Sequence, residues 1–162
     1  MSVVVADNSP IDVLVRLGCE DLLPTLFGQV VIPRQVQEEL LSLKTPKATR
    51  QFVLSPPDWF LVREPLSVES IPRLHAGEEA AISLALEMKA DLLLIDEERG
   101  RQEAVKRGLA ITGVIGILEV SARRSLLDLR ETFARLVSET DFRINPDFLA
   151  ERLELFETEM LD

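Results

Sequence analysis

Short runs of consecutive apolar residues alternate along the chain with longer segments in which apolar residues recur every three or four positions. The short runs are typical of strands buried on both faces, and the longer segments are typical of amphipathic helices. The pattern predicts strands over 3–6, 29–32, 59–63, 92–95 and 109–112. It predicts helices after Pro10, from Pro33 to about Leu43, in the region before Ser55, from Glu78 to Lys89, after Asp96 to about Arg107, and three more from Ile115 onward.

This alternation favours an α/β fold with a central, mainly parallel sheet and helices on both faces. The 162 residues suffice for one domain with its own core, and no linker is long enough to divide them. We therefore expect a single domain over 1–162, with a core of about 1–125 and a C-terminal helical extension of about 126–162.

Two acidic residues directly follow predicted buried strands. Asp7 ends the run Val3 to Ala6, and Asp96 ends the run Leu92 to Ile95. In parallel α/β sheets, ligands bind beyond the carboxyl ends of the strands, so both side chains are candidates for a functional site. The alternative for Asp7 is a role as a turn or helix-capping residue.

Two further acids are predicted on inward-facing parts of helices. On the helix from Pro33, Glu39 falls at the rim of the apolar stripe, which includes Leu43, whereas Glu38 faces water. On the helix from Glu78, that first glutamate falls inside the apolar arc. A buried carboxylate costs several kcal/mol unless it is paired, protonated or bound to a metal, so Glu78 needs a partner.

Asp7, Glu39, Glu78 and Asp96 are thus expected to converge on one pocket. Like charges at short range raise the pKa values of carboxyl groups unless cations neutralise them. Hard oxygen ligands suit Mg²⁺ or Mn²⁺, and such ions can activate water for attack on a phosphodiester. The competing interpretation is chance, because the chain holds 28 acids.

The overall charge limits the function classes. With 18 basic and 28 acidic residues the net charge is −10, which argues against a protein that coats duplex nucleic acid. Arg99 and Arg101, in a locally basic stretch, either contact RNA phosphates or lie on a solvated helix face. A single cysteine, Cys19, and the absence of an apolar run long enough to span a membrane indicate a cytoplasmic protein.

Several motifs in order resemble the PIN-domain family of metal-dependent ribonucleases, which includes the VapC-like toxins of toxin–antitoxin pairs, and in particular its branch of small predicted nucleic-acid-binding proteins. The resemblance rests on Asp7 to Ile11, Val31 to Leu40, Gly77 to Ala85, Leu93 to Arg101, Ile111 to Leu118 and Phe142 to Pro146. It implies a three-layer α/β/α fold.

The resemblance also implies roles for single residues. Asp7, Glu78 and Asp96 would be metal ligands, directly or through water, and Glu39 would complete the cluster and orient the attacking water. Asn8 or Ser9, together with Thr112, would fix these carboxylates by hydrogen bonds. Asp96 and its neighbour Glu97 compete for one ligand position, and this sequence has Glu78 where many relatives have aspartate.

The expected function is a Mg²⁺- or Mn²⁺-dependent endoribonuclease that acts as a homodimer and is inhibited by a small antitoxin protein, with RNA as its substrate. The alternative is a PIN-fold interaction module with little catalytic activity. Phosphoryl transfer through an aspartyl intermediate is less favoured, because Ser9 stands where such enzymes carry a second aspartate. The only histidine, His75, is not needed for catalysis by a metal-bound hydroxide.

Overall fold

The computed structural model describes residues 2–162 and has a five-stranded, all-parallel sheet at its centre. The strands are β1 (Val4–Ala6), β2 (Val30–Pro33), β3 (Phe60–Arg63), β4 (Leu92–Leu94) and β5 (Ile111–Thr112), in the order β3-β2-β1-β4-β5. Val5 of β1 pairs with Val31 on one side and with Leu93 on the other. The predicted α/β class with a parallel sheet is confirmed.

The helices lie between and after the strands. Their bounds are α1 Asn8–Arg16, α2 Leu22–Phe27, α3 Arg34–Leu40, α4 Lys47–Leu54, α5 Ala76–Glu87, α6 Glu98–Lys106, α7 Val114–Arg123, α8 Leu129–Glu139 and α9 Pro146–Leu161. The short helix α2 was not predicted, because the chain between Gly18 and Gly28 is too short to show a helical period.

For the helix predicted to begin at Pro33, which is α3, the predicted end is wrong. Helix α3 stops at Leu40, and Leu43 is 87% exposed rather than part of the buried stripe. The chain turns here because the Ser42 amide bonds back to the Glu39 carbonyl, and the Thr45 hydroxyl donates to the same carbonyl. Glu39 is therefore in the last turn of a short helix, with a tight turn directly after it.

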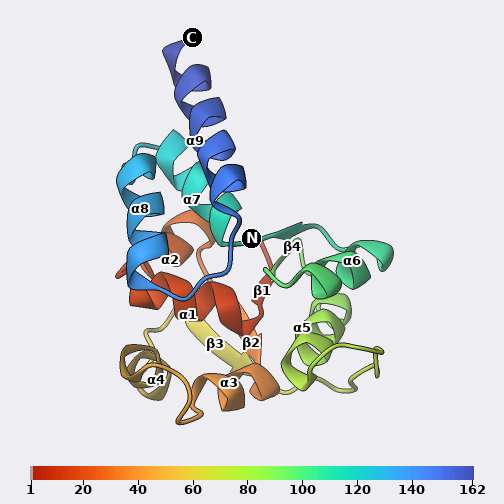
Figure 1. Ribbon diagram of the computed structural model, residues 1–162. Coiled ribbons are helices and arrows are strands. Elements are labelled where there is room, and N and C mark those ends of the chain that lie inside the picture. The colour runs from red at the N-terminus through yellow and green to blue at the C-terminus, as the bar shows by residue number, and fades with distance from the viewer. Residues whose placement is uncertain (1) are drawn as a thin grey trace.

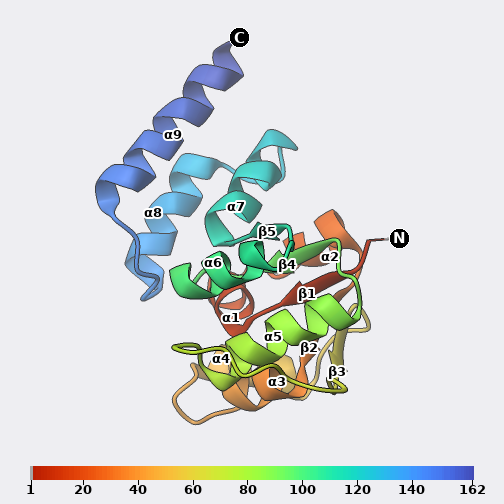
Figure 2. The same cartoon turned by 90° about the vertical axis from the view of Figure 1, so that its right-hand side faces the viewer.

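The helices cover both faces of the sheet, as Figures 1 and 2 show. Helix α5 packs against β1, β2 and β4 on one face, and α1 lies on the opposite side of β1. The buried strands consist of aliphatic residues, with Val5, Ile32, Leu93 and Leu94 fully buried. This burial on both faces explains why the strands appear in the sequence as unbroken apolar runs.

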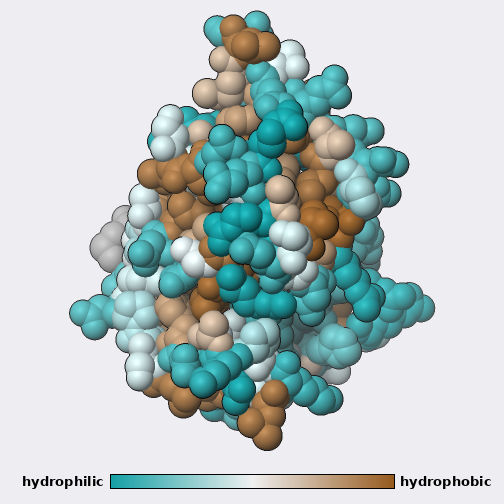
Figure 3. Space-filling view, turned by 60° about the vertical axis from the view of Figure 1, so that its left-hand side comes forward, coloured by the Kyte–Doolittle hydropathy of each residue, from teal (hydrophilic) through white to brown (hydrophobic). Residues whose placement is uncertain are grey.

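The last helix, α9, extends away from the sheet beside α7 and α8 (Figure 1). Leu149 is its only residue in the buried class, and a two-bond ion pair between Arg152 and the buried Glu119 ties it to α7. On the face shown in Figure 3, hydrophobic residues gather in patches beside this helix on a mostly hydrophilic surface. No helix within 2–162 is both long enough and apolar enough to cross a membrane.

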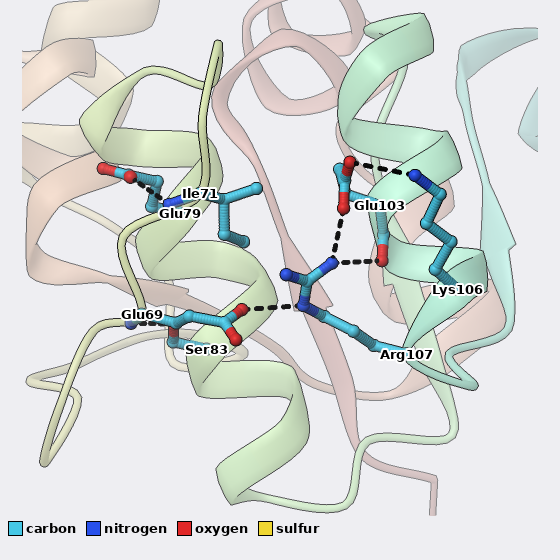
Figure 4. A network of polar contacts seen from close by, with 7 residues as sticks. All are labelled: Glu69, Ile71, Glu79, Ser83, Glu103, Lys106 and Arg107. Carbon is cyan, nitrogen blue, oxygen red and sulfur yellow. Dashed lines mark hydrogen bonds and ion pairs between the residues drawn. The ribbon is translucent and has the colours of Figure 1, made fainter.

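The irregular segment 64–75 is held along one side of α5 by hydrogen bonds to side chains. Three side chains spaced four residues apart on α5 accept backbone amides from this segment. Glu79 accepts the amide of Ile71, Ser83 that of Glu69, and Glu87 that of Leu66. Figure 4 shows two of these bonds, together with the ion pair between Glu69 and Arg107 that joins the segment to α6. This network fixes the chain that leads into the start of α5.

Candidate active site

The carboxyl ends of β1 and β4 open into a cleft of about 1010 Å³. The chain after β1 leads to β2, toward one edge of the sheet, and the chain after β4 leads to β5, toward the other edge. Parallel sheets bind ligands at the point where neighbouring connections diverge in this way. Asp7, Glu39, Glu78 and Asp96 all line this cleft. The four acids come from four separate segments of the chain, and the fold brings them together.

Asp7 is the most buried member, with 4% of its surface exposed. It occupies the N-cap position of α1, yet its side chain makes no capping hydrogen bond there. Burial raises the pKa of Asp7 to about 7, the backbone amide of Asn8 opposes this shift, and the charges of Glu78, Glu39 and Asp96 add to it. The capping alternative is therefore unsupported, and burial disfavours the charged form of Asp7.

Glu39 is held in place through both carboxylate oxygens. The Asn8 side-chain amide donates to one oxygen at 2.6 Å, and the Gly77 backbone amide donates to the other at 2.9 Å. A Cβ atom at Gly77 would overlap this carboxylate, so the glycine leaves the space that the carboxylate fills. Burial raises the pKa of Glu39, and the two hydrogen bonds limit that rise.

Glu78 is 6% exposed, in the first turn of α5. One of its oxygens accepts the His75 backbone amide at 3.0 Å, a bond that closes the start of the helix. Its other oxygen, Oε2, lies against Gly100 of α6, where a Cβ would approach it to 3.1 Å. Helix capping therefore uses half of this carboxylate and leaves the other half without a partner.

Asp96 lies just before α6. Its Oδ1 accepts the Val114 amide at 2.9 Å, and a Cβ at Gly113 would overlap that oxygen. Burial raises the pKa of Asp96, while this amide and the Ser9 hydroxyl counteract the shift. Of the two adjacent candidates, Asp96 is the one whose charge acts on Asp7, whereas Glu97 is exposed at the cleft's margin.

Three of the four acids each have one buried oxygen without a hydrogen-bond partner: Asp7 Oδ1, Glu78 Oε2 and Asp96 Oδ2. Buried unsatisfied oxygens of this kind cost free energy, and a cation supplies what they lack. Within 2–162, no three His, Cys, Asp or Glu side chains lie in a group that could hold a metal ion by themselves. Magnesium usually takes one or two carboxylates and keeps several waters, so the donors fit a hydrated Mg²⁺ or Mn²⁺.

The remaining predicted residues are dispersed. Asn8 and Ser9 bond to site carboxylates, but Thr112 lies in a second cleft, with its hydroxyl against Gly116. Arg101 lines that second cleft and donates to the Ile95 carbonyl, whereas Arg99 is exposed and lines neither cleft.

Several residues that line the first cleft were not among the predicted site residues. His75 lines it from the start of α5, and Lys44, Phe142 and Arg143 line it from more distant segments. Arg16 also lines it and is paired with Asp12 and Asp141. These residues come from loops and helix ends, where the spacing of hydrophobic residues does not predict which way a side chain points.

Comparison with known proteins gives a family and a fold. A family model described as PIN domain matches residues 3–158. The structure is similar to that of a PilT N-terminus domain protein from the hyperthermophilic archaeon Sulfolobus solfataricus, with a TM-score of 0.53 and 13% identity, over 88% of this chain and 97% of that one. No curated protein matches the sequence. At 13% identity the structural likeness concerns the fold alone.

Proposed function

Because the chain belongs to the PIN-domain family, whose fold is of the nuclease type, we propose that it is a divalent-metal-dependent endoribonuclease. The observation that carries this proposal is the set of buried, unpartnered oxygens on Asp7, Glu78 and Asp96 in one cleft. Charged groups kept in an unfavourable buried environment are concentrated at functional sites.

In this proposal Asp7, Glu78 and Asp96 would hold a hydrated Mg²⁺ or Mn²⁺, one or two of them directly and the rest through water on the ion. A bound divalent cation lowers the pKa of water and stabilises charge on the phosphate in the transition state. The second oxygens of Glu78 and Asp96 are fixed by the His75 and Val114 amides, so these carboxylates keep one orientation. Such outer hydrogen bonds hold metal ligands in place and tune their basicity.

Glu39 orients the attacking water and accepts its proton. Both of its oxygens are already positioned by Asn8 and Gly77, and each carboxylate oxygen has a further lone pair available. The raised pKa of Glu39 makes the carboxylate a better proton acceptor at neutral pH. The water oxygen bonds to phosphorus while the bond from phosphorus to the 3′ oxygen breaks, and the 3′ oxygen takes a proton from solvent. The products carry 5′-phosphate and 3′-hydroxyl ends.

We also propose that the protein is the toxin of a toxin–antitoxin pair and acts as a homodimer. What supports the inhibitor is electrostatics: a cluster of unpartnered carboxylate oxygens attracts an arginine from a partner protein, which can bond to a carboxylate through two N–H groups. Co-expression with the product of a neighbouring small reading frame, followed by co-purification, tests this partner.

The test of the enzyme is RNA cleavage by the purified chain with Mg²⁺ or Mn²⁺. We expect activity that EDTA removes and that falls at least about 100-fold in Asp7→Asn, while Asp58→Asn, at an exposed site before β3, retains it. Equal cleavage by the wild type and Asp7→Asn would show contamination by another nuclease. If neither cation changes activity or melting temperature, the fold acts instead as an interaction module.

A further inference from the structure

The cleft that holds the carboxylates shares a wall with a second cleft. This second cleft, of about 900 Å³, lies between α6, β5, the start of α7 and the connection from α8 to α9. Asp96, Glu98, Phe142 and Arg143 line both clefts. The two hollows therefore form one path past Asp96, and residues 141–148, here called the connecting segment, border that path.

The connecting segment is held in a fixed position at both ends. Asp141 pairs with Arg16 of α1 at 2.5 Å, and Asn145 caps α9 by accepting the amides of Asp147 and Phe148. Because the segment is already ordered, a ligand that binds it loses little entropy to ordering. Arg143 lies between these two anchors.

Positive charge without a partner is found along this path. Among residues 2–162, Lys44 in the first cleft and Arg143 in both have no carboxylate within ion-pair distance, whereas the charge of Arg101 in the second cleft acts on Asp96. By contrast, Arg16 and Arg152, which also line the clefts, are neutralised by acids. A chain with net charge −10 thus keeps two unpaired cations, Lys44 and Arg143, in the cleft that holds its carboxylates. Such cations favour a polyanion that passes the carboxylates.

Aromatic side chains flank the unpaired arginine. Phe142 is half-buried and Phe148 is 47% exposed, and both line the second cleft. Other aromatic residues of this chain, Phe52, Trp59 and Phe60, contact one another instead. Proteins bind single strands by stacking bases on aromatic rings beside cations that contact the backbone, whereas paired bases in a duplex have no free face.

We propose that the connecting segment is the binding site for single-stranded RNA, a proposal that rests on the ribonuclease function. Arg143 contacts a phosphate next to the one at the carboxylates, and Phe142 and Phe148 stack on bases of the strand that runs into the second cleft. This makes the substrate an unpaired RNA and makes Arg143 a positioning residue for it.

Binding is measured first, in EDTA, so that no cleavage occurs. The probe is a fluorescein-labelled single-stranded RNA of mixed sequence, compared with its duplex and with the same single-stranded DNA, by anisotropy at several salt concentrations. We expect Arg143→Gln to weaken single-strand binding about tenfold and to reduce the slope of log affinity against log salt by about 0.7. Arg143→Lys should restore the slope, since it keeps the charge.

Arg124→Gln is the matched control, because Arg124 is exposed, has no acidic partner in the described chain and lines neither cleft. It should change affinity by less than about twofold.

Phe142→Leu should weaken binding about tenfold with an unchanged salt slope, because stacking releases no ions. Phe27→Leu, at a half-buried site outside both clefts, controls for the lost ring. Urea unfolding followed by Trp59 fluorescence verifies that each variant folds.

Cleavage in Mn²⁺ then separates positioning from chemistry. Arg143→Gln should raise KM about tenfold and leave kcat within about twofold, because the strand is held less tightly while the carboxylates are unchanged. A fall in kcat at constant KM, or equal effects of Arg143→Gln and Arg124→Gln, would overturn the proposal. So would duplex RNA binding as tightly as the single strand, or no nucleic acid binding at all, in which case the segment serves a protein partner.

The outcomes also separate this inference from the proposed function. If the wild type cleaves RNA but Arg143→Gln behaves like Arg124→Gln, the ribonuclease stands and the binding site is wrong. If the wild type binds single-stranded RNA through Arg143 yet never cleaves it with either cation, the binding site stands and the enzymatic proposal is wrong.

Discussion

Replacing Asp7 by asparagine is expected to stabilise the metal-free protein at neutral pH and to remove its stabilisation by divalent cations. Asp7 is almost fully buried and has an oxygen without a partner, and its pKa rises from 3.8 to about 7 in the folded state. Asparagine has nearly the same shape and no charge, so it avoids the cost of holding a carboxylate in this place.

The sign and size of the effect follow from proton binding. Because the folded state has the higher pKa, the stability that protonated Asp7 provides is complete below pH 3.8 and is lost as the pH rises to about 7. The shift spans about three pH units at about 1.4 kcal/mol each, so the full loss is roughly 4 kcal/mol. In EDTA, the advantage of Asp7→Asn over the wild type should therefore grow between pH 4 and pH 7 and then stay constant.

The assay is urea unfolding in EDTA at a series of pH values, followed by fluorescence. Trp59 is the only tryptophan, and it packs on Phe52 and Phe60, so its emission reports on the core. Repeating the series at pH 7.5 with Mn²⁺ should raise the stability of the wild type by about 2.7 kcal/mol when the ion is at 100 times its Kd. Asp7→Asn should gain little.

Two results would refute this reasoning. If Asp7→Asn is less stable than the wild type in EDTA at pH 8, then burial does not penalise the Asp7 charge. If both proteins gain the same stability from Mn²⁺, then Asp7 does not hold the cation. Asp58→Asn, which removes an exposed acid, should follow the wild type in both series.

Two further predictions concern the carboxylate that the proposal assigns to proton transfer. Glu39→Gln should lower kcat for RNA cleavage at least about 100-fold, while Glu38→Gln, one residue earlier on the solvent side of α3 and paired with Arg34, should retain it within about twofold; equal losses would remove Glu39 from the mechanism. Gly77→Ala should lower cleavage about tenfold or more without loss of stability, because its Cβ displaces the Glu39 carboxylate while alanine favours the helix; unchanged kcat in this variant would contradict the positioning of Glu39.

The fold was largely predictable from the sequence because its strands are buried on both faces. Runs such as Leu92 to Ile95 have no polar interruption, and such runs separated by helices allow few topologies. The incorrect predictions concern local features of the chain. The end of α3 depends on the Thr45 hydroxyl donating to the Glu39 carbonyl. The spacing of hydrophobic residues does not reveal such a side-chain contact, and Leu43 was therefore wrongly predicted to be buried.

The site was predictable to the extent that regular structure sets the direction of its side chains. Asp7 and Asp96 follow strands, and Glu39 and Glu78 have angles on helices, so each was a candidate before the structure. Arg143 and Phe142 lie in a connection without helical or strand period. Their place beside the carboxylates is set by contacts between distant parts of the chain, including the packing of Phe142 on the core and the Arg16–Asp141 ion pair, which joins residues 125 positions apart.

The electrostatics of this cleft are a property of the fold rather than of the overall composition. Parallel pairing of β1 with β4 places Asp7 and Asp96, 89 residues apart in sequence, at one edge, and α3 and α5 add Glu39 and Glu78 there. Three glycines, Gly77, Gly100 and Gly113, each lack a Cβ where a site carboxylate lies, so the backbone approaches all but Asp7 closely. Such packing prevents the acids from turning away to water and relieving their repulsion, and the folded chain therefore keeps a charge cost that only protons or cations remove.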